Sequence, residues 1–143
     1  MEISFFKGDS SLLYEIEKDD DKEVLELKDL EYEVHENPVS KILVIKDNLK
    51  IIGYLDYWIT FDSSTIFKII IKKEYRAQGL ASSLLEKMFE DLKENEVLFS
   101  TLEVRVSNEN AIKLYKKFNY EKVTIKEKYY KDGEDAIYMV RGI

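Results

Sequence analysis

One stretch of the sequence, from Ile66 to Leu92, constrains the fold of this chain more than any other. It opens at residues 66–71 with apolar, mostly β-branched side chains, which are typical of a largely buried strand. After a charged turn, apolar residues recur at spacings of three, four and one, as on one face of an amphipathic helix. These helix positions are Leu80, Leu84, Leu85, Met88, Phe89 and Leu92. The stretch therefore predicts a strand, a short loop and a helix, with Gly79 where the loop becomes the helix.

The junction between that loop and helix is suited to an anion. The first turn of a helix has free backbone N–H groups and the positive end of the helix dipole. Gly79 and Ala81 have almost no side chain, so a phosphate can approach the backbone, and Arg76 can add a charge-assisted hydrogen bond. The alternative is that Gly79 only makes a tight turn. The spacing matches neither a Walker loop nor a dinucleotide-binding fingerprint.

The composition excludes several classes of function. The chain has 143 residues, of which 45% are hydrophobic and 36% charged, so we expect residues 1–143 to form one globular domain. It has no cysteine, which excludes a thiolate metal site and a cysteine nucleophile. The one histidine, His35, leaves little for a histidine-based metal site or a serine–histidine pair, and we expect no metal. The net charge of −7 argues against nucleic-acid binding and suits a cationic partner such as an amine.

The sequence shows no membrane or export signal. No apolar run approaches the roughly 20 residues that span a bilayer. Residues 1–11 lack the basic start and the long apolar core of a signal peptide. We therefore expect a cytoplasmic protein that binds no membrane, and a monomer or weak dimer.

The first 40 residues predict one short strand and two short helices. Residues 1–7 can form the strand, and Ser10 or Ser11 can cap a helix over residues 12–16. We expect the acidic run 19–21 to be a solvated turn rather than a metal loop, because the spaced glycine and glutamate of a calcium loop do not follow it. Apolar residues at 24–30 suggest the second helix, and Glu31 to Ser40, with the only proline and with His35, is expected to be a loop. We expect His35 to have a surface or packing role.

Strands then dominate the chain. Residues 42–45 and 51–61 are expected to pair through a turn at Asp47-Asn48, with a bulge near Gly53. After the organising unit, Phe99 to Val106 alternates apolar and polar residues, and a strand–helix–strand unit implies a parallel pair with a right-handed crossover. The remaining expected elements are a helix over 107–118 that ends at Asn119, and a strand pair at 120–128 and 136–140 joined through Asp132-Gly133.

Arg76-x-x-Gly79-x-Ala81 after an apolar strand resembles the Arg/Gln-x-x-Gly-x-Gly/Ala signature of the GCN5-related N-acetyltransferases (GNAT). The resemblance runs from about Phe61 to Arg141. In that family this loop holds the pyrophosphate of acetyl-coenzyme A (acetyl-CoA). The resemblance implies an α/β (α+β) fold, a mixed, mostly antiparallel twisted sheet of about seven strands flanked by about four helices. It departs from the usual pattern at Ala77, Ala81 and Asn119.

Later segments resemble the RimI-type branch of this family, which acetylates the N-terminal alanine of a small-subunit ribosomal protein. They are Leu102-Glu103-Val104-Arg105, Ser107-Asn108-x-x-Ala111-x-x-Leu114-Tyr115, Tyr129-Tyr130 and Glu134-Asp135-Ala136 with Met139. The resemblance implies Glu103 as general base and Tyr115 as general acid. It implies that the coenzyme is bound by Ile69, Ile70, Ile71, Arg76, Ala77, Gln78, Gly79, Leu80, Ala81, Ser82 and Asn108. It implies that Tyr129, Tyr130 and Glu134 shape the peptide site.

The chemistry of amine acetylation fits these residue types. An amine attacks a thioester only when neutral, which at pH 7 costs about 1 kcal/mol for an α-amine and about 4–5 kcal/mol for a lysine. Glu103 can therefore be a modest base, and Arg105, on the same strand face, can pair with it and keep it ionised. Tyr115 can protonate the leaving thiolate. The alternatives are an exposed strand charge for Glu103 and a core aromatic for Tyr115.

The resulting hypothesis is direct acetyl transfer from acetyl-CoA to a protein N-terminus in a ternary complex. The absence of cysteine argues against an acyl-enzyme formed through a thiol. Ribosomal protein is the acceptor class that the resemblance favours. Two alternatives stay open. One is an acetyltransferase for a small, polyamine-like amine, and the other is a non-catalytic acyl-CoA-binding module.

Overall fold

The computed structural model describes residues 1–143 and is built on a seven-stranded sheet in the order β1-β2-β3-β4-β5-β7-β6. The strands are β1 (Glu2–Phe5), β2 (Ser40–Asp47), β3 (Lys50–Thr60), β4 (Ser63–Ile71), β5 (Phe99–Arg105), β6 (Glu121–Lys126) and β7 (Ala136–Gly142). The helices are α1 (Ser11–Glu17), α2 (Leu27–Glu31), α3 (Leu80–Glu94) and α4 (Glu109–Lys117). All neighbouring strands are antiparallel except β4 and β5. The expected mixed sheet with four α-helices is confirmed.

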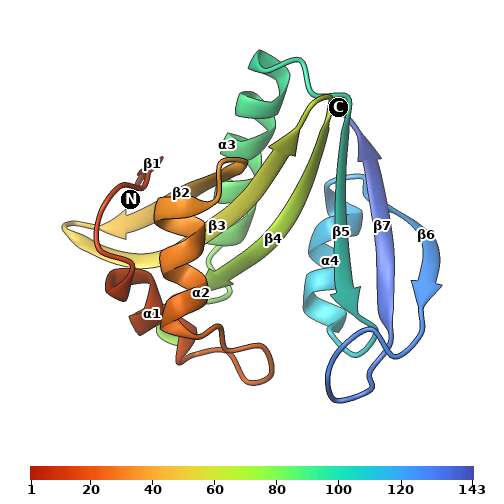
Figure 1. Cartoon of the computed structure of the whole chain (residues 1–143), viewed down its shortest axis with the longest axis horizontal. Helices are drawn as coiled ribbons and strands as arrows, with labels where there is room; N and C mark the ends of the chain where they lie inside the picture. The colour runs from red at the N-terminus through yellow and green to blue at the C-terminus, as the bar shows by residue number, and fades with distance from the viewer.

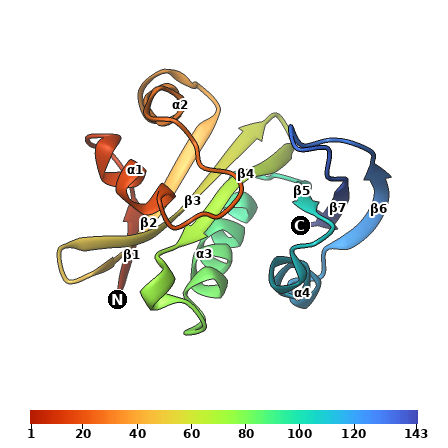
Figure 2. The same cartoon turned by 90° about the horizontal axis from the view of Figure 1, so that it is seen from below.

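The helices cover both faces of the sheet, with α1 and α2 on one side and α3 and α4 on the other (Figures 1 and 2). Each face has its own core because side chains alternate along a strand. On β2, Ile42 and Val44 pack with α1 and α2, whereas Leu43 and Ile45 pack with α3. None of the helices combines the length and the apolar character that crossing a membrane requires.

The predicted helix at the centre of the chain is α3. Its apolar positions Leu84, Leu85, Met88, Phe89 and Leu92 are all buried in the larger core, as the periodicity predicts. Gly79 precedes the helix with φ of 78°, a left-handed conformation that favours glycine. The glycine therefore ends the loop and starts the helix, as expected from the sequence.

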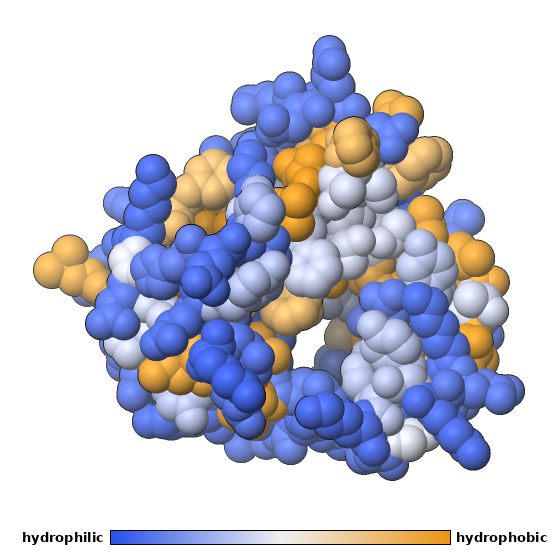
Figure 3. Space-filling model, in the orientation of Figure 1, coloured by the Kyte–Doolittle hydropathy of each residue, from blue (hydrophilic) through white to orange (hydrophobic).

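Strands β4 and β5 run parallel but separate soon after they pair. Their register covers only Ser63–Thr65 against Phe99–Thr101, and no strand lies beside the rest of β4 on that edge. A bulge at Phe67 bends β4, since Lys68 and Ile66 face consecutive residues of β3. The two halves of the sheet diverge in Figure 1, and the space-filling view shows an opening between them (Figure 3).

A second bulge lies at Ile52 of β3, beside Gly53, where the sequence predicts one. Gly53 has a separate reason to be glycine. A Cβ built on it would lie 2.5 Å from Ile71 Cδ1 and 2.9 Å from the Ile70 carbonyl oxygen. The missing side chain allows β3 to lie close to the end of β4, the part of the sheet that borders the opening.

Several turns follow their sequence signals. Asn48 in the first hairpin has φ of 57°, and Asn119 at the end of α4 has φ of 67°. Both asparagines adopt the left-handed conformation that this residue tolerates. Gly133, with φ of 89°, lies in the connection between β6 and β7.

The N-terminal region corrects three expectations. Neither Ser10 nor Ser11 caps α1 with its side chain; the carboxylate of Asp9 accepts from the Ser11 backbone N–H at 2.9 Å instead. The second helix begins at Leu27 rather than at residue 24. The segment Glu31–Ser40 is not simply a loop, because helix α2 continues into a π-helical turn, η1 (Tyr32–Glu36).

The reason for the extra turn is a buried carboxylate. Glu33 is 4% exposed and accepts hydrogen bonds from Trp58 Nε1 at 2.7 Å and from Asn37 Nδ2 at 2.9 Å. Trp58 lies on β3, so this contact between distant parts of the sequence fixes the helical turn against the sheet. A local sequence pattern does not reveal such a contact.

Candidate active site

The loop from Arg76 to Gly79 forms an exposed cradle at the end of β4. Ala77 and Gly79 both have left-handed backbones, with φ of 62° and 78°. A Cβ built on Gly79 would meet nothing within 4 Å, so the space in front of it is open. The first-turn N–H groups of α3, from Leu80 to Ser82, have no partner within their helix by its geometry. Loop and helix end together can bind an anion, such as the phosphates of a nucleotide.

Arg76 fixes the position of this loop. Its Nε donates to the Ile71 carbonyl at 2.9 Å, and its Nη2 donates to the Asp19 carbonyl at 2.8 Å. The guanidinium has five N–H donors, so others stay available for a phosphate. Arg76 therefore joins the end of β4 to the segment between α1 and α2 and still lies beside the cradle.

The open edge of β4 includes Ile69, Ile70 and Ile71. Strand β3 pairs with one edge of these residues, and β5 has already diverged from the other. Ile70 and Ile71 anchor the strand in the two cores on opposite faces of the sheet. Backbone groups on the free edge can therefore bind an amide-containing ligand in the manner of an added strand.

Glu103 lies on β5, across the opening from that edge, and is partly buried with 18% of its side chain exposed. The expectation that Arg105 pairs with it is wrong. Lys126 of β6 donates to Glu103 Oε1 at 2.8 Å instead. The Lys126 ammonium also lies 4.6 Å from the ring centroid of Tyr138 and 5.6 Å from that of Tyr129. The Glu103 carboxylate and the two rings thus all lie near one ammonium group, an arrangement that can bind an amine.

Arg105, only 7% exposed, has other partners. Its Nη1 donates at 2.8 Å to both Asp132 and Glu134 in the connection before β7, and its Nη2 donates to Glu23 from the segment after α1. Its guanidinium lies 4.1 Å from the ring centroid of Tyr130. Because three segments meet at this one side chain, Arg105 organises the wall beside Glu103.

The three residues expected at the peptide site belong to this wall. The rings of Tyr129 and Tyr130 meet edge-on with centroids 5.0 Å apart. Glu134 accepts from the Ser107 backbone N–H at 2.9 Å as well as from Arg105. Hydrogen bonds from Ser107 and then Arg105 lower the pKa of Glu134 to about 2. Glu134 is therefore a fixed carboxylate that holds the wall to the start of α4.

Tyr115 lies on α4 with its ring buried in the larger core, 5.7 Å from the ring of Tyr120. Burial raises the pKa of Tyr115 above its usual value near 10, at which a phenol is already protonated at neutral pH. The ring packs as a core aromatic, and the hydroxyl carries a proton that it could donate. The two interpretations of Tyr115 are thus compatible.

Asn108 is the N-cap of α4. Its side-chain oxygen accepts from the Ala111 backbone N–H at 3.2 Å, which helps to start the helix. This contact uses the oxygen only. The amide nitrogen of Asn108 stays available to a ligand from an exposed position next to the opening.

In the segment from Asp19 to Glu23, the acidic run 19–21 is only in part the solvated turn that the sequence suggests, because Asp21 is exposed but Asp19 and Asp20 are partly buried. On the β4 side, Asp20 accepts from Lys68 at 2.5 Å, and Asp19 accepts from the Lys73 backbone N–H at 2.8 Å. On the β5 side, Glu23 contacts Arg105. The segment therefore connects the two halves of the sheet, and hydrophilic atoms border the opening in Figure 3.

Sequence reasoning missed Lys126 and this connecting segment. Lys126 lies three residues before the Tyr129-Tyr130 pair, which is the only local signal for it. Glu23 is separated from Arg105 by 82 residues, and no spacing rule links them. In the sequence, Lys126 and Glu23 look like ordinary charged residues. Only folding brings Lys126 to Glu103 and Glu23 to Arg105.

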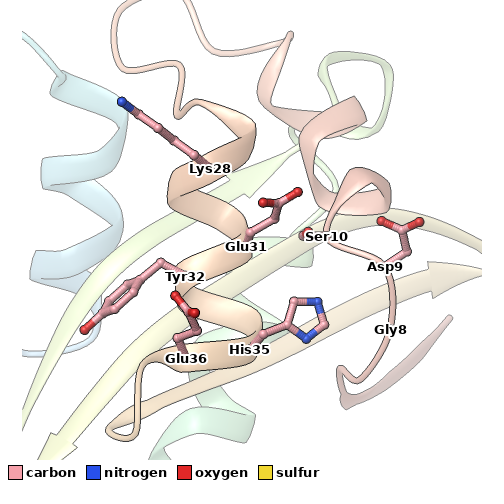
Figure 4. Close-up of a pocket in the computed structure, with 8 residues that line it drawn as sticks. All are labelled: Gly8, Asp9, Ser10, Lys28, Glu31, Tyr32, His35 and Glu36. Atoms are coloured by element: carbon pink, nitrogen blue, oxygen red, sulfur yellow. The ribbon is translucent and has the colours of Figure 1, made fainter.

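A separate surface pocket lies between α2 with its π-helical turn and the segment after β1 (Figure 4). In this view Glu31 and His35 point toward Asp9 and Ser10, whereas Tyr32 and Lys28 point the other way. None of the predicted site residues lines this pocket. His35 is exposed, in agreement with the surface role expected for it.

Comparison with known proteins identifies similar enzymes. Residues 10–120 match the acetyltransferase (GNAT) family. A protein of Bacillus subtilis (strain 168), named as a candidate [ribosomal protein bS18]-alanine N-acetyltransferase, is 43% identical over 109 residues, covering 76% of this chain and 72% of the relative. The [ribosomal protein bS18]-alanine N-acetyltransferase of Escherichia coli (strain K12) is 37% identical over 98 residues, covering 66% of each chain.

Solved structures agree in fold. The crystal structure of the ribosomal-protein-S18-alanine N-acetyltransferase from Escherichia coli has a TM-score of 0.91 and 30% identity, covering 99% of this chain and 93% of that one. Arabidopsis thaliana NAA60 in complex with acetyl-CoA has a TM-score of 0.85 and 18% identity, covering 99% of this chain and 97% of that one. The second likeness is one of fold alone.

Proposed function

Because this chain belongs to the acetyltransferase (GNAT) family, we propose that it transfers acetyl from acetyl-CoA to the N-terminal α-amine of a protein. The proposed acceptor is the N-terminal alanine of ribosomal protein bS18, which the names of the B. subtilis and E. coli relatives give. One observation carries the proposal. Glu103 lies on β5, across the opening from the free edge of β4, and the anion cradle lies at the end of that edge.

The coenzyme fits the open side of β4. Residues 76–82 and the first turn of α3 would bind its pyrophosphate through backbone N–H groups, and Arg76 would add charge. The free backbone edge of Ile69–Ile71 would bind the amides of the pantetheine arm, with Asn108 on the facing side. Acetyl-CoA supplies a thioester that is reactive toward an amine.

Glu103 and Tyr115 would move the protons. Glu103 would accept a proton from the α-amine, directly or through a water. The demand on it is modest, because freeing an α-amine at pH 7 costs only about 1 kcal/mol. Tyr115, whose phenol is protonated at neutral pH, would donate a proton to the departing thiolate. With no cysteine in the chain, no protein thiol can carry the acetyl group.

The wall formed by Tyr129, Tyr130 and Glu134 would receive the acceptor peptide. Arg105 holds that wall against β5, two residues beyond Glu103, so the wall and the base belong to one rigid unit. Tyr129 is 48% exposed, which leaves its ring available for packing against the first residues of an acceptor.

The proposal is tested by a steady-state assay with acetyl-CoA and three acceptors. These are a short peptide beginning Ala-Arg, the same peptide with a blocked N-terminus and an internal lysine, and spermidine. We expect thiol release only with the free N-terminus. Release with spermidine alone would assign the protein to the small-amine acetyltransferases. No release from any acceptor, with acetyl-CoA binding intact, would support a coenzyme-binding module.

A further inference from the structure

The surroundings of Glu103 already contain an ammonium group. Lys126 Nζ lies 2.8 Å from Glu103 Oε1, and 4.6 and 5.6 Å from the ring centroids of Tyr138 and Tyr129. A carboxylate and two aromatic faces are the groups that recognise an organic cation. The chain therefore has an ammonium-binding site beside its proposed base, and one of its own lysines fills it.

Lys126 reaches this site from two strands away. Its backbone is at the end of β6, opposite Ala136 of β7, whereas Glu103 of β5 is opposite Tyr138 of β7. The side chain thus extends across β7 to bring its ammonium to Glu103. It makes no other ion pair, and 41% of it is exposed, so it can leave without disturbing the core.

We infer that Lys126 occupies the position of the acceptor amine while no acceptor is bound, and that it competes with cationic acceptors for Glu103. This inference rests on the proposed function, since it takes Glu103 as the group that receives the amine. Lys126 would thereby be a residue that determines specificity. A protonated amine must displace the Lys126 ammonium, because two cations beside one carboxylate repel each other. A neutral amine can lie beside it.

This competition favours amines that lose their proton easily. At pH 7 about one in ten α-amino groups is neutral, against about one in 2,500 lysine side chains. The hydrogen bond with Glu103 raises the pKa of Lys126, so the lysine stays cationic over the range in which an α-amine titrates. Lys126 would therefore select N-termini against lysine side chains and polyamines.

Equilibrium binding tests the competition without turnover. Isothermal titration of the Ala-Arg peptide into the CoA-bound protein is compared for the wild type, Lys126→Gln, Lys126→Arg and Lys122→Gln. Lys122 lies on the same strand, is exposed and forms no ion pair, so its substitution removes the same charge without touching Glu103. At pH 6.5 we expect Lys126→Gln to bind the peptide about fivefold more tightly, as expected for loss of one partly exposed ion pair.

The gain in affinity should shrink at pH 8.5, where less of the peptide is cationic. The Lys126→Arg and Lys122→Gln proteins should bind like the wild type, since each keeps a cation beside Glu103. In the kinetic assay at pH 8.5, where the α-amine is mostly neutral and the internal lysine is still cationic, Lys126→Gln should lower the preference in kcat/KM for the free N-terminus over the internal lysine by up to about fivefold. Equal affinity of the wild type and Lys126→Gln at pH 6.5 would overturn the inference.

The outcomes separate this inference from the proposed function. If the wild type acetylates the Ala-Arg peptide and Lys126→Gln binds it no more tightly, the inference alone fails. If the wild type acetylates only spermidine, the proposed function fails, and the same comparison of spermidine affinities decides the role of Lys126. Tighter spermidine binding by Lys126→Gln would then support competition at Glu103, and unchanged binding would exclude it.

Discussion

Arg105 donates to Glu134 at 2.8 Å and so joins the last residue of β5 to the connection that precedes β7. The same carboxylate accepts from the Ser107 backbone N–H at 2.9 Å, which adds the start of α4 to the contact. Glu134 therefore fixes the wall of the proposed acceptor site to the strand that carries Glu103. Its ionisation becomes part of the stability of the protein.

The Glu134 carboxylate should make the free energy of unfolding depend on pH in the acidic range. Its pKa is lowered from 4.5 to about 2 by hydrogen bonds from Ser107 and Arg105. A group with a lowered pKa stabilises the fold above its unfolded pKa, and this stabilisation disappears as pH falls from 4.5 to about 2. The free energy of unfolding of Glu134→Gln should therefore fall less across that window. Urea denaturation between pH 2 and 6 measures it, with exposed Glu127→Gln as control.

The contribution of Asp56 to the stability of the fold should depend on pH in the opposite direction. It is 1% exposed and lies beside Glu33, and burial followed by the Glu33 contact raises its pKa from 3.8 to about 10. A raised pKa contributes stability below 3.8 that is lost as pH rises toward 10. Asp56→Asn, which has no proton to lose, should raise the Tm at pH 8 by about 4 °C or more, with a smaller gain near pH 4. An equal gain at both pH values in calorimetry would contradict this account.

Gly79→Ala tests the coenzyme cradle, and Gly133→Ala is its matched control. Both glycines have positive φ, 78° and 89°, and a Cβ on either meets nothing within 4 Å. Each substitution should therefore cost about 1 kcal/mol of stability through backbone strain. Only Gly79→Ala should raise the KM for acetyl-CoA, by about tenfold or more, because its methyl group enters the cradle. A similar KM increase for both variants would assign the effect to general destabilisation.

Glu103→Gln tests the base. The amide keeps the shape of the side chain but cannot accept the proton, so kcat should fall by about 10²-fold or more. The KM for acetyl-CoA should stay close to that of the wild type, since Glu103 lies outside the cradle. Steady-state kinetics from pH 6 to 9 would check this, because a base role requires the largest loss at low pH, where the acceptor is most protonated. An unchanged kcat would remove Glu103 from the mechanism.

Tyr115→Phe tests the proton donor, and Tyr120→Phe is the comparison on the same core. The Tyr115 ring packs in the larger core, which a phenylalanine ring can also fill, whereas the Tyr120 hydroxyl lies 2.6 Å from the buried Ser100 Oγ. Tyr115→Phe should therefore lower kcat about tenfold or more with little change in Tm. Tyr120→Phe should lose about 1 kcal/mol of stability and keep its kcat. The reverse pattern would favour a purely structural Tyr115.

Local features of the sequence predicted much of the fold. The sequence predicts several turns and helix ends correctly, because capping and turn conformations depend on a few adjacent residues. Examples are Gly79 before α3, Asn119 after α4 and the Asp47-Asn48 hairpin. The apolar spacing of α3 was visible for the same reason, since a helix brings residues three and four apart onto one face. The candidate residues Glu103 and Tyr115 came from a resemblance, and their roles remain predictions.

Contacts between distant residues decided what the sequence alone did not. The sequence predicts Arg105, on the same strand face, as the partner of Glu103 and gives no comparable signal for Lys126. In the folded chain Arg105 instead pairs with three acids, Glu23, Asp132 and Glu134. Glu103 pairs with Lys126. The π-helical turn depends in the same way on Glu33 reaching Trp58.

The sequence by itself thus determined which segments become helices, strands and turns, because short-range sterics and hydrophobic periodicity act within a few residues. The tertiary structure decided where β4 leaves β5, which cation lies on Glu103, and how an acidic segment joins the two halves of the sheet. These features depend on the distances between charges that only folding brings together, and Coulomb energy follows distance in space rather than separation along the chain.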